Sequence, residues 1–155
     1  MAIGDVQAVA DATDVYYVDT GMYGTAEYGS VYIIDGERTA VVDSGTGGDY
    51  ERIVGALDEL GIGGLDAVVL THVHLDHAGG AGRLLEDFSD AQVYVHERGA
   101  RHLIDPDRLV AGTKDAVGDQ WQYYAEPVPV PEDRLTRLAD GDAVDLGDRT
   151  LTAHE

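Results

Sequence analysis

The chain has 155 residues, a length that suits one domain, and 44% of them are hydrophobic, which is typical of a folded globular protein. Thirty Asp and Glu residues face ten Lys and Arg residues, so the formal net charge is −20. Such a charge repels phosphates and disfavours a nucleic-acid partner. The sequence has no cysteine, which excludes disulfides and thiolate metal sites.

The acidic residues are dispersed along the chain, and Lys114 is its only lysine. We interpret this pattern as the solvating carboxylate surface of a halophilic protein, in preference to an acidic face for a cationic partner. The first residues show no basic, apolar leader, and no apolar run approaches the roughly 20 residues of a membrane span. We therefore expect a cytoplasmic protein with no membrane partner.

The first half of the chain predicts strands followed by a strand–helix–strand unit. Three β-rich runs come first, at 14–20, 30–36 and 38–45. Gly36 and Glu37 between the last two runs predict a tight hairpin. Residues 47–61 carry apolar side chains at helical spacing and end on Gly61, and the apolar run 65–71 predicts a buried strand.

The second half alternates helices with strands. A helix, a strand and a longer helical segment are predicted at 79–88, 91–96 and 96–118. Pro106 breaks the longer segment. Alternate prolines make 126–134 an extended linker, and 142–155 predicts a hairpin that turns at Gly147 and Asp148. The pattern as a whole predicts a mixed α/β fold with one mixed sheet and flanking helices.

The segment THVHLDHAGG, residues 71–80, places four metal-binding side chains in six positions. They are His72, His74, Asp76 and His77. In an extended segment, residues 72, 74 and 76 share one face, so the chain must turn to bring His77 round, and the following AGG supplies flexible residues for that turn. The spacing favours two ions, with His72 and His74 on the first and Asp76 and His77 on the second.

Imidazole and carboxylate ligands suit zinc, iron and manganese, and we take zinc as the first choice for the two divalent ions. A pair of ions lowers the pKa of a bridging water and polarises a carbonyl or phosphoryl oxygen, which is the chemistry of hydrolysis. A surface loop with incidental histidines is the alternative. We set it aside because three of the chain's six histidines stand in this stretch.

The motif THVHLDHAGG, preceded by an apolar strand, resembles the THxHxDH signature of the metallo-β-lactamase fold hydrolases. AVVDSGTGG (40–48), YGSVYIID and LGDRTLTAHE resemble further segments of this family. The resemblance implies an αββα sandwich with metals between two sheets. It also implies that Asp43 supports the metal ligands and that Asp76 orients or deprotonates the attacking water. From the residues alone, Asp43 could instead cap the helix at 47–61 or form a turn.

The chain departs from the family where further ligands are expected. A third His should follow the strand at 149–154, and a bridging Asp and a last His should come later, but none is present. His154 falls inside the predicted strand, and we interpret His96 and His102 as surface or packing residues. We therefore expect 1–155 to be the N-terminal portion of a longer domain, inactive alone. The alternative is a short protein that completes its site by pairing with another chain, for example as a homodimer.

Within the family that the chain resembles, His77 directly after Asp76 implies a dinuclear hydrolase, and we expect one that acts on esters, thioesters or lactones of small molecules. An iron-dependent enzyme of the persulfide dioxygenase kind and a non-catalytic metal-binding protein of the same fold are the alternatives. The aromatic residues Trp121, Tyr123 and Tyr124 could line a pocket, although we favour packing. The Tyr/Gly loop at 21–30 could border the cleft or serve as a connector.

Overall fold

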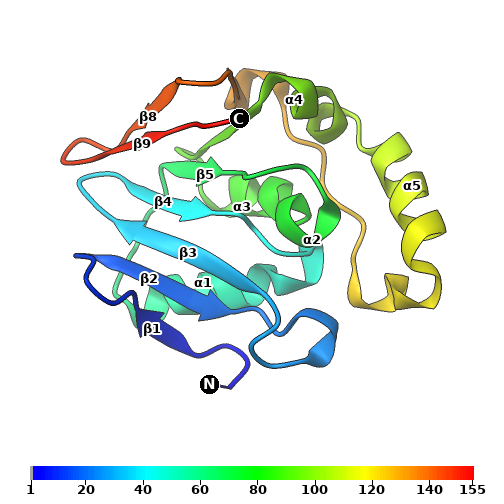
Figure 1. The fold of residues 1–155 in the computed structure, drawn as a ribbon, viewed down its shortest axis with the longest axis horizontal. Helices are drawn as coiled ribbons and strands as arrows, with labels where there is room; N and C mark the ends of the chain where they lie inside the picture. The colour runs from blue at the N-terminus through cyan, green and yellow to red at the C-terminus, as the bar shows by residue number, and fades with distance from the viewer. Residues whose placement is uncertain (1) are drawn as a thin grey trace.

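The computed structural model describes residues 2–155, which build a large mixed β-sheet flanked by helices (Figure 1). Seven strands form this sheet, in the spatial order of their numbers. They are β1 (Val6–Ala8), β2 (Val15–Asp19), β3 (Ser30–Asp35), β4 (Thr39–Val42), β5 (Ala67–Val69), β6 (Gln92–His96) and β7 (Leu135–Leu138). A separate hairpin pairs β8 (Ala143–Asp145) with β9 (Thr150–Thr152).

The helices fall between these strands. The α-helices are α1 (Tyr50–Glu59), α2 (Leu75–Ala78), α3 (Ala81–Asp87), α4 (Glu97–Ile104) and α5 (Asp107–Val117). Short 3-10 helices are η1 (Met22–Gly24), η2 (Gly47–Asp49), η3 (Gly118–Tyr123) and η4 (Glu132–Arg134). The predicted helices and the break at Pro106 are confirmed. No helix of the described residues is long and apolar enough to cross a membrane.

The sheet changes direction at β4. Strands β1 to β4 pair antiparallel, whereas β4 to β7 pair parallel, with Val42 opposite Val69. Because parallel strands end at the same edge of a sheet, the residues that follow β4 and β5 emerge side by side. Asp43 follows β4, and the segment 70–74 follows β5. This edge of the sheet therefore gathers the residues of the predicted metal site.

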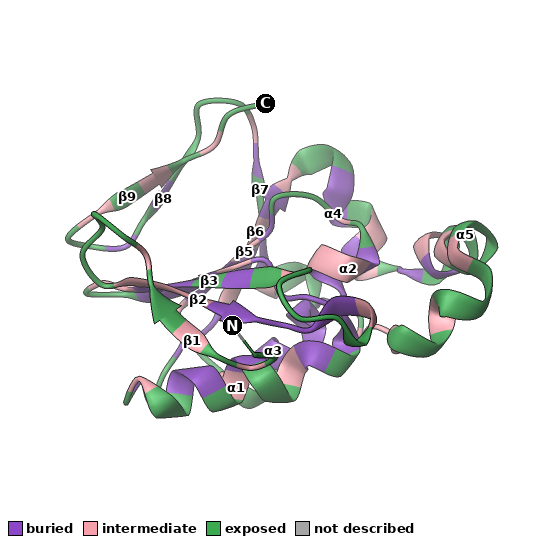
Figure 2. Ribbon diagram, turned by 60° about the horizontal axis from the view of Figure 1, so that its bottom comes forward, coloured by how far each residue is buried: buried purple, intermediate pink, exposed green. Residues whose placement is uncertain are grey.

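The two faces of the sheet have different covers (Figure 2). Val41 and Val68 point into a core shared with α1 and α3, whereas their neighbours Ala40 and Ala67 pack under the β8–β9 hairpin, against Val144. Because both faces are covered, these strands are apolar at consecutive positions. The predicted mixed sheet with flanking helices is confirmed, and the hairpin lies on the face where the resemblance implies a second β layer.

Two strands were not predicted from the sequence, and a third is shorter than predicted. β1 has three residues at the sheet edge, and β7 directly follows the Pro-rich segment. In β7, Leu135 and Leu138 are the buried residues, so its burial does not alternate as in a half-buried strand. β5 covers Ala67–Val69, not the whole of 65–71, although the amides of Asp66 and Leu70 still donate to the carbonyls of Thr39 and Tyr94.

Candidate metal centre

The metal-ligand motif begins as an extended loop after β5 and then becomes a helical turn. The carbonyl of His74 accepts hydrogen bonds from the amides of His77, at 2.9 Å, and Ala78, at 2.8 Å, so α2 starts at Leu75. The prediction of an extended chain through Asp76 is therefore wrong. Neighbouring residues of a helix differ by about 100° in direction, not by the 180° of a strand, and Asp76 and His77 can face the same space.

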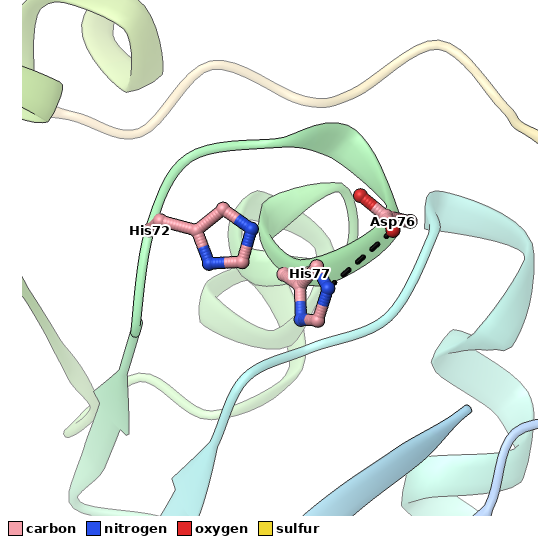
Figure 3. A group of neighbouring side chains, drawn as sticks. All are labelled: His72, Asp76 and His77. Carbon is pink, nitrogen blue, oxygen red and sulfur yellow. Dashed lines mark ion pairs between the residues drawn. The ribbon is translucent and has the colours of Figure 1, made fainter. Parts of the chain in front are cut away.

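Three of the predicted ligands converge, as Figure 3 shows. Ligand atoms of His72, Asp76 and His77 all lie within 4.8 Å of one another. The rings of His72 and His77 have centroids 4.2 Å apart, and Nε2 of His77 lies 3.4 Å from Oδ2 of Asp76. Two imidazoles and one carboxylate form a donor set that suits zinc, iron or manganese. The residues present thus fit a divalent ion.

His74 stands apart from this cluster. Its ring lies against the ring of His72, with centroids 4.9 Å apart, but its nitrogens are not among the clustered ligand atoms. The predicted pairing of ligands put His72 with His74 and Asp76 with His77. The geometry instead brings His72 together with Asp76 and His77, because the helical turn folds the second pair back toward the first.

Asp43 supports the cluster from the neighbouring strand end. Its carboxylate accepts hydrogen bonds from the amide and hydroxyl of Thr71, at 2.9 and 2.8 Å, and its Oδ2 lies 2.9 Å from Nδ1 of His77. Asp43 is nearly buried and has a φ of 66°, a left-handed conformation that costs energy for a residue other than glycine. Its alternative role as a helix cap is wrong, because Thr46 is the N-cap residue there and its amide donates to the Asp49 carboxylate at 2.9 Å.

These hydrogen bonds fix the proton positions on two histidines. A carboxylate only accepts, so Nδ1 of His77 donates to Asp43 and its Nε2 keeps a free lone pair. The single hydroxyl proton of Thr71 goes to Asp43, so the Thr71 oxygen, 2.9 Å from Nδ1 of His72, accepts from that nitrogen. Both imidazoles therefore present Nε2 as the metal-binding atom, and both are oriented by Asp43, one of them through Thr71.

The protonation of His72 also favours metal binding. Burial lowers the pKa of His72, and the neighbouring imidazoles of His77 and His74 lower it further. A histidine must be neutral to bind a metal. His72 therefore remains competent to bind at a lower pH than an isolated imidazole.

The two glycines of the motif serve packing. Gly79 and Gly80 have ordinary negative φ values, so the prediction that they supply flexibility for the turn is wrong. A Cβ on Gly79 would meet backbone atoms of Thr46 and Gly47, and one on Gly80 would meet the carbonyl of Ser44. The amide and hydroxyl of Ser44 both donate to the carbonyl of His77, at 2.7 and 2.9 Å. These contacts join α2 to the loop that carries Asp43.

The other histidines lie outside the cluster. His96 ends β6 and has Nε2 3.6 Å from a carboxylate oxygen of Glu155, and His102 lies in α4. His154 follows β9, which ends at Thr152, so its predicted place inside the strand is wrong. Among the described residues, none of the three belongs to a group of clustered ligands.

One of the three aromatic residues after α5, Tyr124, reaches the site, whereas Tyr123 is exposed. Tyr124 lines a cavity together with His74 and Asp76, and its hydroxyl lies 2.9 Å from that of Tyr23 in the 21–30 loop. Trp121 stacks on Tyr124 with ring centroids 5.5 Å apart. Packing, the role that we favoured for these residues, is therefore only part of the role of Tyr124, which also lines the cavity. Burial raises the pKa of its hydroxyl, which stays protonated.

The fold and the cluster together define a class of α/β protein that holds metal ligands on loops at the carboxyl edge of a mixed sheet. Residues 24–155 match the sequence profile of the metallo-beta-lactamase superfamily, and the chain belongs to that family. The Gallus gallus protein described as acyl-coenzyme A thioesterase MBLAC2 is 32% identical over 155 residues, which cover 89% of this chain.

Solved structures share the fold. The chain resembles MEM-A1, a subclass B3 metallo-beta-lactamase from a soil metagenome library, with a TM-score of 0.72, 23% identity and 99% of this chain covered. It also resembles ST1585 of Sulfolobus tokodaii, an archaeal superfamily member, with a TM-score of 0.73, 24% identity and 90% of this chain covered. The chain spans 52% of the length of the Gallus gallus thioesterase and 54% of each of these two structures.

Proposed function

We propose that this chain carries the first metal-binding half of a hydrolase that cleaves ester, thioester or lactone bonds in a small molecule. The observation that supports the proposal is the convergence of His72, Asp76 and His77 beside Asp43. The similarity to a protein described as a thioesterase favours the same reaction class. Two divalent ions, with zinc as the first choice and iron or manganese as alternatives, are the proposed cofactors.

Each residue of the site has a proposed part in the reaction. Bound divalent ions would supply a water of lowered pKa and polarise the scissile carbonyl. His72 and His77 offer Nε2 as ligands, held in place by Thr71 and Asp43. Asp76, whose carboxylate is about one-third exposed, can bind an ion through one oxygen and accept a proton from the attacking water through the other.

The ligands that would complete two metal sites are proposed to lie outside residues 1–155. The three clustered ligands and His74 are too few to complete two metal sites, because a structural or catalytic zinc commonly has three or four protein ligands. The relatives named above are about twice as long as this chain. We therefore propose that full activity needs the rest of a longer domain, or a partner such as a second copy.

Asp76→Ala tests this function in the protein at the full length that its gene encodes. We expect the variant to bind less of one metal ion and to lose hydrolysis by about 100-fold or more, because it lacks both a ligand and a proton acceptor. Metal analysis and thioester, ester and lactone assays measure both effects. Unchanged turnover, or iron with oxygen uptake and no hydrolysis in the parent protein, would contradict the proposal.

A further inference from the structure

A cavity of about 560 Å³ lies next to the metal cluster, between α2, α4 and α5. Figure 1 shows α5 standing apart from the sheet, with α4 and α2 on its inner side. His74 and Asp76 form the wall that the cavity shares with the metal-binding motif. A molecule bound in this cavity would therefore reach the metal-binding residues.

Two arginines of this cavity lack the acidic partners that half of the chain's basic residues have. Five of the ten basic residues form ion pairs with carboxylates: Arg52, Arg98, Lys114, Arg137 and Arg149. Arg38 and Arg134 donate to backbone carbonyls. Arg101 and Arg108, which both line the cavity, form no ion pair with any described carboxylate. Arg83 also forms no ion pair with a described carboxylate, but it does not line the cavity. With thirty acidic residues in the chain, two guanidinium groups without a carboxylate partner in one cavity are unusual.

The two guanidinium groups make the lining positive. Nε of Arg101 donates a hydrogen bond to Nε2 of the neighbouring His102, at 3.4 Å. Asp76 is the only carboxylate among the described residues that line the cavity, and it belongs to the metal cluster. Guanidinium groups bind carboxylates and phosphates through paired hydrogen bonds.

The rest of the lining is mainly apolar. Leu75, Leu109, Val117 and the half-buried ring of Tyr124 contribute to it. A cavity with an apolar wall, two unpaired arginines and a metal-binding motif suits a ligand with an apolar body and an anionic end.

We propose that this cavity binds an anionic group of the substrate, a carboxylate or a phosphate, through Arg101 and Arg108. The position of the scissile bond near Asp76 rests on the proposed function. Binding of the anion itself depends only on the cavity. The two arginines select substrates that carry a negative charge at one end and a hydrolysable bond at the other.

Anion binding is tested on the metal-free protein, so that the probe cannot bind a metal ion. Inorganic phosphate and succinate are titrated at constant ionic strength, and the fluorescence of Trp121, the only tryptophan, reports binding because its ring stacks on Tyr124. We expect Arg101→Gln and Arg108→Gln each to raise the Kd about tenfold. Arg137→Gln removes the same charge from an exposed ion pair with Glu132 and should leave the Kd unchanged.

The comparison of the two probes assigns the anion. Tighter binding of phosphate indicates a phosphorylated substrate, and tighter binding of succinate indicates a carboxylate. Both arginines are exposed, so their replacement by glutamine should preserve the fold. If neither probe binds, or if all three variants weaken binding equally, the proposed anion site is wrong.

A kinetic comparison connects the cavity to the reaction. The metal-loaded, full-length protein is assayed with two thioesters that differ only in a terminal carboxylate or a neutral carboxamide. We expect a lower KM for the charged thioester, and Arg108→Gln should remove this preference with little change in kcat. Equal KM values for the two thioesters in the parent protein would overturn the inference. If neither thioester is cleaved while arginine-dependent anion binding persists, the proposed function fails and the anion site stands.

Discussion

The hydroxyl of Thr71 lies 2.8 and 3.0 Å from the two carboxylate oxygens of Asp43, and 2.9 Å from Nδ1 of His72. Asp43 also accepts a hydrogen bond from Nδ1 of His77, 34 residues further along the chain. One carboxylate at the end of β4 therefore orients two imidazoles, that of His72 on the loop after β5 and that of His77 in α2. The parallel pairing of β4 with β5 therefore places Asp43 beside the ligands that it orients.

Thr71→Val tests the part of the hydroxyl. Valine has nearly the same shape but cannot accept the proton of His72 Nδ1, so we expect zinc affinity to fall about 10-fold or more while the fold persists. Competition with a chelator of known affinity measures the change. Thr71→Ser keeps the hydroxyl and should bind zinc nearly as the parent does. Equal losses in both variants would show that the methyl group, and not the hydrogen bond, supports the site.

Much of the fold follows from local sequence pattern. The hairpin turn at Gly36, the helix that ends on Gly61 and the break at Pro106 each depend on residues close in sequence, and all three are confirmed. β1 and β7 could not be predicted in the same way. Each is a short strand that is stable only because a neighbouring strand offers hydrogen bonds, and β7 buries residues three apart.

The metal site could be predicted only in part, because one of its features is local in sequence and another is not. The ligand types and the position after a buried strand could be read from the motif, but the grouping of His72 with Asp76 depends on a four-residue helix. Such a helix is too short to show a periodic pattern, and it is held by Ser44 from another element. The cavity with Arg101 and Arg108 has no sequence signal, because these residues lie on two helices joined at Pro106.

Gly79→Ala tests whether close packing of the motif holds the site together. The new methyl group would meet backbone atoms of Thr46 and Gly47, which cannot move independently, so we expect a loss of about 2 kcal/mol of unfolding free energy and weaker zinc binding. Urea unfolding and chelator competition measure the two effects. Gly55→Ala, in an exposed position of α1 with open space around it, should instead stabilise by about 0.5–1 kcal/mol. Equal stability of the two variants would contradict the packing account.

The lowered pKa of His72 predicts a pH dependence of the metal-free protein. Below about pH 6.5 the unfolded chain is protonated at His72, whereas the folded protein takes up this proton only at a lower pH. Folding therefore becomes less favourable as the pH falls below about 6.5. Urea unfolding on either side of it should show that His72→Gln loses less stability than the parent protein. The exposed His154→Gln should behave as the parent does. An identical pH dependence in all three proteins would show that His72 titrates as a free imidazole.

The net charge of −20 predicts that salt stabilises the protein. Carboxylates dispersed over the surface repel one another, and added ions screen this repulsion. We expect the Tm to rise between about 0.1 M and about 2 M KCl, because the Debye length falls below the spacing of most surface charges. A Tm that does not rise with KCl would contradict the proposed halophilic adaptation.

The metal content of the purified protein tests the central claim most directly. Elemental analysis after dialysis compares the full-length parent with the double variant His72→Ala/His77→Ala and with His154→Ala, which lies outside the cluster. The account predicts bound divalent metal in the parent and in His154→Ala, and a loss of most of it in the double variant, because both Nε2 ligands are removed. Full metal content in the double variant would contradict a metal centre built on these residues.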